Sequence, residues 1–69
     1  MNIDTARKMI RLEFNKPHRF LYRGNRNQNE IFDGKITKIY PSVFLIETPE
    51  GIRSFSLNDF IIDCIKIIS

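Results

Sequence analysis

The sequence predicts a mainly-β domain in which one N-terminal helix precedes five short strands. Three observations support this prediction. An apolar stripe at helical spacing is confined to the first 14 residues. Short runs rich in Phe, Tyr, Ile and Val then recur between turn signals. The chain has only 69 residues, which indicates a single domain over residues 1–69.

The helix is expected over residues 4–14. Its apolar positions recur at spacings of three and four: Ile3, Ala6, Ile10 and Phe14. Asp4 is the expected N-cap, because its carboxylate can accept the free amide hydrogens of the first turn. Asn15 and Pro17 are expected to end the helix, since the residue before a proline avoids the helical conformation.

The five strands are expected to follow one another with short connections. Their predicted ranges are 18–23, 30–39, 43–48, 52–57 and 63–68. Gly34 lies inside the second range, where a missing side chain often marks a bend or a bulge. The third range begins with four consecutive apolar residues, which indicates burial on both faces. Residues 56–59 are interpreted as a short turn or one turn of 3₁₀-helix.

Short strands and a glycine bend favour a small, strongly bent barrel over residues 18–68. Closing the sheet in this way also removes most of its exposed edge. We therefore expect an SH3-like, Sm-like five-stranded barrel that carries an N-terminal helix. An oligonucleotide-binding barrel is the alternative, although that fold usually needs a longer chain.

The residue types that carry catalysis are scarce. His18 is the only histidine, and no Cys, His and carboxylate set has the spacing of metal ligands. Neither of the glycine-rich phosphate-binding motifs occurs. We therefore expect a protein that is not an enzyme, with no catalytic residues, no metal and no cofactor.

The chain also has no pattern typical of export or membrane insertion. No apolar run approaches the ~20 residues that a membrane-spanning helix needs. The N-terminus does not have the composition of a secretory signal. The single cysteine, Cys64, cannot form an internal disulfide. These features predict a cytoplasmic protein without membrane contact.

Positive charge is concentrated at the front of the chain. Residues 1–26 contain seven basic residues against two acidic ones, whereas residues 27–69 contain four against six. Within this region basic and aromatic side chains alternate, and five of them form the candidate site: Lys16, Arg19, Tyr22, Arg23 and Arg26. Arginine pairs with phosphate, and exposed rings stack on unpaired bases. The same pattern also fits Phe20 and Tyr22 as core residues with solvated arginines around them.

Three basic residues of the helix, Arg7, Lys8 and Arg11, could extend that surface or could form a solvated helix face. Nucleic acid, either RNA or single-stranded DNA, is therefore one possible partner. An acidic protein surface is another.

The stretch Tyr40-Pro41-Ser42-Val43-Phe44, together with Gly34, Ser56 and Asp59, resembles the Veg family of Gram-positive bacteria, labelled a biofilm formation stimulator. The resemblance extends from about Asp4 to Lys66. It implies an SH3-like fold and a small cytoplasmic regulator without catalytic activity. It also implies an effect on transcription of biofilm genes, through protein–protein interaction with a DNA-binding repressor.

Two functional hypotheses follow. In the first, the chain is a Veg-like regulator that forms a homodimer or binds a transcriptional regulator protein. We expect Phe44 and Phe60 to be exposed and to anchor this interface, because aromatic residues dominate protein interfaces. In the second, residues 16–26 bind nucleic acid, with an affinity that falls steeply as salt is raised.

Overall fold

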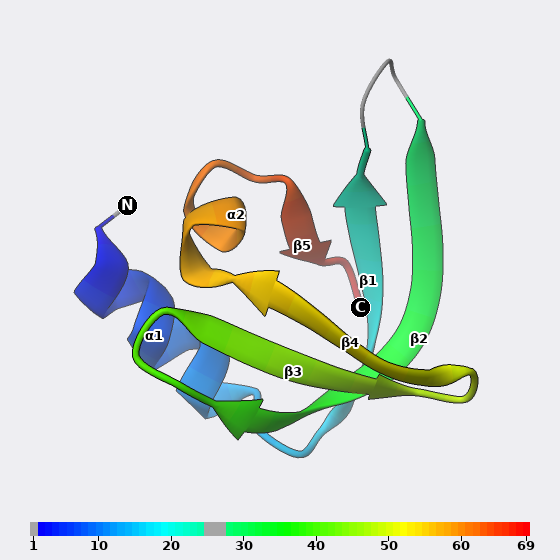
Figure 1. Cartoon of the computed structure of the whole chain (residues 1–69), viewed down its shortest axis with the longest axis horizontal. Helices are drawn as coiled ribbons and strands as arrows, with labels where there is room; N and C mark the ends of the chain where they lie inside the picture. The colour runs from blue at the N-terminus through cyan, green and yellow to red at the C-terminus, as the bar shows by residue number, and fades with distance from the viewer. Residues whose placement is uncertain (1, 25–27) are drawn as a thin grey trace.

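One antiparallel sheet and two helices make up residues 2–24 and 28–69, which are the residues that this computed structural model describes. Their order along the chain is α1 (Ile3–Leu12), β1 (Pro17–Arg23), β2 (Asn29–Ile39), β3 (Val43–Thr48), β4 (Gly51–Ser56), α2 (Leu57–Ile61) and β5 (Ile65–Ile67) (Figure 1). The strand order across the sheet is β4-β3-β2-β1-β5. The predicted mainly-β architecture with an N-terminal helix is confirmed.

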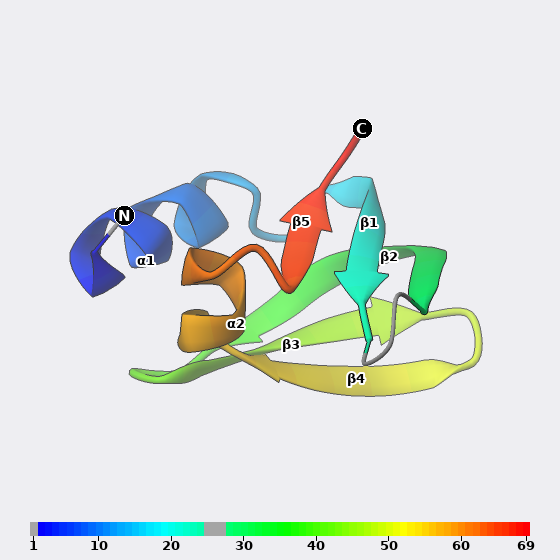
Figure 2. The same ribbon diagram turned by 90° about the horizontal axis from the view of Figure 1, so that it is seen from above.

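The sheet is strongly bent, because the long strand β2 curves and belongs to both of its halves (Figure 1). In the view of Figure 2, β1 and β5 lie on one side of the fold and β3 and β4 on the opposite side. The two helices lie next to each other at the left of this view. Among the described residues β4 does not pair with β5, so the expected closed barrel is not formed. The physical reason is α2, which connects these two edge strands and packs against both of them.

The helix α1 begins earlier and ends earlier than expected. The side chain of Asn2, rather than Asp4, is the N-cap, and it accepts a 2.8 Å hydrogen bond from the amide of Thr5. Asp4 instead lies in the first turn, where the helix dipole favours negative charge. The helix ends at Leu12, and Asn15 then adopts φ 61°, a left-handed conformation that asparagine tolerates.

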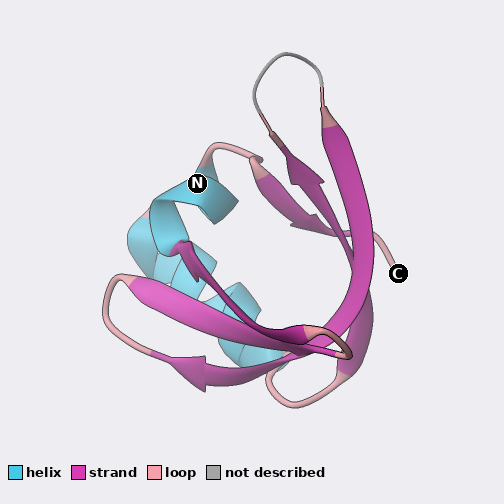
Figure 3. Ribbon diagram, turned by 45° about the vertical axis from the view of Figure 1, so that its right-hand side comes forward, coloured by secondary structure: helices cyan, strands magenta, loops and turns pink. Residues whose placement is uncertain are grey.

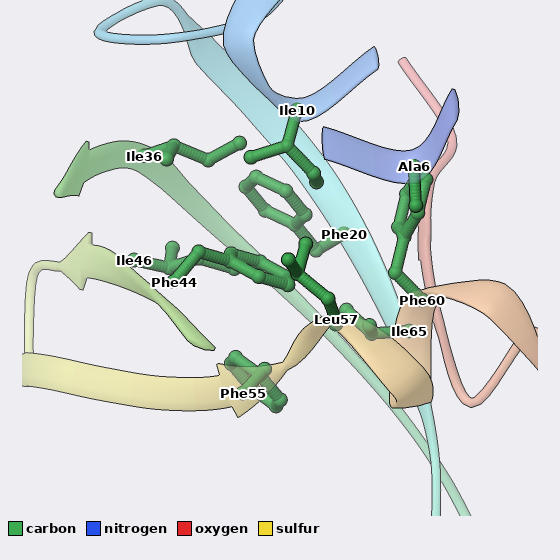
Figure 4. Close-up of a cluster of buried hydrophobic side chains, with 10 residues drawn as sticks. All are labelled: Ala6, Ile10, Phe20, Ile36, Phe44, Ile46, Phe55, Leu57, Phe60 and Ile65. Atoms are coloured by element: carbon green, nitrogen blue, oxygen red, sulfur yellow. The ribbon is translucent and has the colours of Figure 1, made fainter. Parts of the chain in front are cut away.

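The core lies between the two halves of the sheet and is closed at one side by the helices (Figure 3, Figure 4). Both helices and all five strands contribute buried side chains to it: Ala6, Ile10, Phe20, Ile36, Phe44, Ile46, Phe55, Leu57, Phe60 and Ile65. Of the stripe predicted on α1, only Ala6 and Ile10 are buried, whereas Ile3 and Phe14 remain exposed. In β5, Ile65 belongs to this core and Ile67 packs against it.

Gly34 does not form the expected bulge. It pairs in regular register with His18, and the irregularity in β2 lies between Ile36 and Lys38 instead. That shift lets Ile36 be buried and Ile39 pack against the same core. The glycine is needed for close approach, because a Cβ atom built on Gly34 would lie 2.8 Å from the carbonyl oxygen of Glu47.

The helix α2 starts with a capping box, at the place where the sequence indicated a short turn or one turn of 3₁₀-helix. The Ser56 hydroxyl accepts a 3.0 Å bond from the amide of Asp59, and the Asp59 carboxylate accepts one from the amide of Ser56. The turn after the helix contains Asp63 at φ 65°. Within residues 2–24 and 28–69, no helix is long and apolar enough to span a membrane.

Replacing Ser56 with alanine should lower the free energy of unfolding by about 1 kcal/mol, because the amide of Asp59 in the first turn of α2 loses its hydrogen-bond acceptor. Urea denaturation followed by circular dichroism measures this loss. Ser54 lies on the same strand and is exposed, so Ser54→Ala is the matched control and should change stability by less than about 0.5 kcal/mol. Equal losses in the two variants would show that the capping box does not stabilise the fold.

Candidate functional site

Four of the five residues predicted as a binding site are described, and these four do not lie on one surface. Lys16 is exposed in the connection between α1 and β1, and Arg19 and Arg23 are exposed on β1. The expected alternation along this strand is confirmed, because Phe20 is buried and Tyr22 packs against the core. Tyr22 therefore faces away from the two arginines. The fifth residue, Arg26, lies outside the described residues.

Arg19 already has an acidic partner. Its Nε lies 3.1 Å from Oδ1 of Asp33, which is directly opposite on β2. Leu21 and Ile31 follow as the next outward-facing pair, so the side chains between Arg19 and Arg23 on this face are aliphatic rather than aromatic. The described part of segment 16–26 therefore does not combine free cations with exposed rings.

Tyr22 is part of an aromatic cluster on the inner side of the sheet. Its ring lies 5.4 Å from that of Phe55, which in turn stacks 6.0 Å from Phe32. The guanidinium of Arg53 lies 4.6 Å from the centre of the Phe32 ring and forms a 3.0 Å ion pair with Glu30. The interpretation of Phe20 and Tyr22 as packing residues therefore fits the structure better than a role in base stacking.

The expectation that Phe44 and Phe60 are exposed interface anchors is wrong. The exposed fractions of these residues are 0% and 8%. Their rings meet edge to face with 6.4 Å between centres, and they bring β3 and α2 together in the core (Figure 4). The sequence pattern could not show this, because α2 turns Phe60 inward only once the chain has folded.

Exposed apolar side chains gather instead in a groove between α1 and the C-terminal segment. Met9 and Leu12 contribute from α1, and Ile68 contributes from the other wall, to a groove of about 530 Å³. We call this the apolar groove. Glu13 and His18 also line it, and the Nε2 atom of His18 lies against the Glu13 carboxylate.

His18 fixes the position of the C-terminal wall of the apolar groove. Its Nδ1 lies 3.0 Å from the carbonyl oxygen of Ser69, and the backbone of Arg19 pairs with that of Ile68 and Ser69. His18 itself is half-buried. Its contacts are structural ones, between the end of α1, β1 and the last residues of the chain.

A second surface forms where α1 meets the end of β2, and sequence reasoning missed most of it. Two open hollows of about 530 and 340 Å³ adjoin there and share Arg11, Ile39 and Tyr40. We define the α1–β2 surface by its charged and aromatic residues: Arg7, Arg11, Phe14, Lys38 and Tyr40. The positive helix face was visible in the sequence, but only the fold brings Lys38 and Tyr40 beside it.

No family model matches this chain, and no curated protein is similar to it at a significant level.

Proposed function

We propose that this chain is a small, non-catalytic cytoplasmic regulator, similar in role to the Veg family, that influences transcription of biofilm genes by binding a DNA-binding repressor. The observation on which this rests is the apolar groove, which exposes large apolar side chains to solvent. The resemblance at residues 40–44 supplies the class of partner. No step of this function needs a metal, a cofactor or a reacting side chain.

The residues that carry the resemblance form a joint between several elements, which supports a shared fold. The turn after β2 is closed by a 2.8 Å bond from the amide of Tyr40 to the carbonyl of Val43. Arg7 donates from α1 to the Pro41 carbonyl at 2.7 Å, and the amide of Leu57 donates to the Ser42 carbonyl at 2.9 Å. This turn therefore positions both helices against the sheet.

The strand order supports an SH3-like arrangement as the finer description of the fold. The last strand pairs with the first, and a short helix connects β4 to β5. An open variant of that barrel agrees with the fold that the resemblance implies. A shared fold alone does not define a function, so the function is inferred from the binding surface.

The apolar groove is suited to an apolar segment of a partner protein. Leu12 is 70% exposed, although it lies on a helix whose opposite face is buried. Met9 and Ile68 flank it with further exposed apolar surface. Such concentrations of apolar surface mark interaction sites, and a few large side chains in them dominate the binding energy. We place the repressor there, and a second copy of the chain is the alternative occupant.

Changing Leu12 and Ile68 together to serine should weaken binding to the purified repressor of the biofilm matrix genes at least tenfold, because two exposed anchors are removed. Calorimetric titration measures the affinity, and a matrix-gene reporter in a Gram-positive host measures the effect on transcription. Ile52→Ser on β4 is the matched control, because Ile52 is 65% exposed and does not line the groove.

Two results would contradict the proposal. One is repressor binding and reporter activity that stay at wild-type levels in the groove variant. The other is a loss of self-association alone, which sedimentation velocity would detect and which would make the groove the interface of a homodimer.

A further inference from the structure

The α1–β2 surface has positive charge that no carboxylate of the described residues neutralises. Arg11 and Lys38 are exposed, and neither lies within 4.0 Å of a carboxylate in the described residues. The two hollows have no acidic lining residue. Asp4 is the nearby acid, and it forms a 3.4 Å pair with Arg7 while its own side chain remains 78% exposed. The surface therefore presents free cations to a ligand.

Two aromatic rings are exposed beside these cations. Phe14 and Tyr40 are 43% and 44% exposed, respectively, although most of the other aromatic rings of the chain lie in or against the core. The backbone holds both of them. Phe14 forms a parallel bridge to Ile36 next to β2, and the amide of Tyr40 closes the turn to Val43. Backbone contacts therefore fix the positions from which both rings extend to the surface.

Arg7 holds the helix against this part of the sheet. It donates a 2.7 Å hydrogen bond to the Pro41 carbonyl, which joins α1 to the turn after β2. Arg11 lies one turn further along the same face of the helix. The cation of Arg11 and the ring of Tyr40 consequently line the same two hollows.

We propose that the α1–β2 surface binds single-stranded nucleic acid. Arg11 and Lys38 contact phosphates, and unpaired bases stack on Phe14 and Tyr40. Cations that follow a backbone beside exposed rings are the usual means of binding single strands, because every base has a face that can stack. A duplex keeps its bases stacked inside, so it gains from the cations but not from the rings.

This activity is separate from the apolar groove. Met9 and Leu12 lie on the side of α1 away from Arg7 and Arg11, because each residue advances about 100° around a helix. Variants of one surface therefore leave the other intact. Nucleic-acid binding at the α1–β2 surface does not depend on the proposed repressor contact, and its residues lie outside segment 16–26.

The test is fluorescence anisotropy with labelled single strands of DNA and RNA and a duplex of equal length, at about 50 and 200 mM salt. The charge variant is Arg11→Glu with Lys38→Glu. Its matched control, Arg23→Glu with Lys16→Glu, changes the net charge equally at two exposed residues that line neither the two hollows nor the apolar groove. Circular dichroism checks that each protein is folded, and Arg11→Gln with Lys38→Gln replaces the charge variant if it is not.

We expect the charge variant to lose at least tenfold in single-strand affinity. Its slope of log affinity against log salt should become shallower by about 1.4, or about 0.7 for each lost phosphate contact. The control should lose much less. Phe14→Leu and Tyr40→Leu should each weaken single-strand binding about tenfold, and change duplex binding little.

Several outcomes would overturn the proposal. The first is no binding at low salt. The second is an equal loss in the control, which would indicate unspecific charge or the segment 16–26. The third is tight binding of polyglutamate that the charge variant also loses, because the surface would then serve an acidic protein. Repressor binding measured on the same variants separates these failures from failure of the proposed function.

Discussion

The substitution Gly34→Val should largely unfold this protein, and Gly34→Ala should lower its free energy of unfolding by about 1–3 kcal/mol. A Cβ atom built on Gly34 would lie 2.7 Å from Cγ2 of Ile46 and 2.8 Å from the carbonyl oxygen of Glu47. The oxygen belongs to the backbone of β3, so it cannot move without displacing the strand. A domain of this size has a total stability of roughly 3–10 kcal/mol, which such strain can consume.

The position can be tested by the dependence of stability on side-chain size. At Gly34 the loss should rise steeply from alanine to valine. Gly51 is the contrasting position, because an added Cβ meets no atom within 4 Å and the cost comes only from its φ of 139°. Alanine and serine at Gly51 should therefore cost about the same. Urea midpoints measure all four variants, and a Gly34→Ala protein as stable as the wild type would refute the steric argument.

Phe44→Ala is expected to lower the free energy of unfolding by about 3–5 kcal/mol. The Phe44 ring is fully buried and contacts the rings of Phe55 and Phe60, so its removal leaves a cavity at the centre of the core. Phe44→Leu keeps most of the volume and should cost less. Thermal and urea denaturation measure both variants.

The exposed residue Ile52 supplies the control for this experiment. Ile52→Ala should change stability by no more than about 0.5 kcal/mol, because its side chain is already 65% exposed. A Phe44→Ala protein with the wild-type midpoint but altered self-association would restore the interface role that the sequence suggested. A large loss of stability in that variant would agree with a core position.

Local chemistry was sufficient to predict several elements. Apolar spacing of three and four identified α1, and alternation in β1 placed Phe20 and Tyr22 on the face opposite Arg19 and Arg23. Residues 43–48 were expected as a strand, and β3 has the same bounds. These features depend on neighbours in the chain, so the sequence contains the information that decides them.

Other local features were predicted at the right place but with the wrong cause. Gly34 was expected to mark a bend or a bulge; the bulge lies elsewhere in the curved strand β2, and the glycine makes room for β3. Residues 56–59 were interpreted as a short turn or one turn of 3₁₀-helix, and Ser56 and Asp59 instead form the capping box of an α-helix. In both cases contact with another element decides the local structure. Gly34 lies against β3, and α2 forms because it buries Leu57 and Phe60 in the core.

The binding surfaces depend on tertiary structure altogether. Charge density along the chain favoured residues 16–26, but the pairing of β1 with β2 places Asp33 against Arg19. The bend of β2 brings Lys38 and Tyr40 beside Arg11, across 27 residues or more of sequence. Packing between distant segments decides which cations remain unpaired and which rings remain exposed. The residue pattern within a single segment does not contain this information.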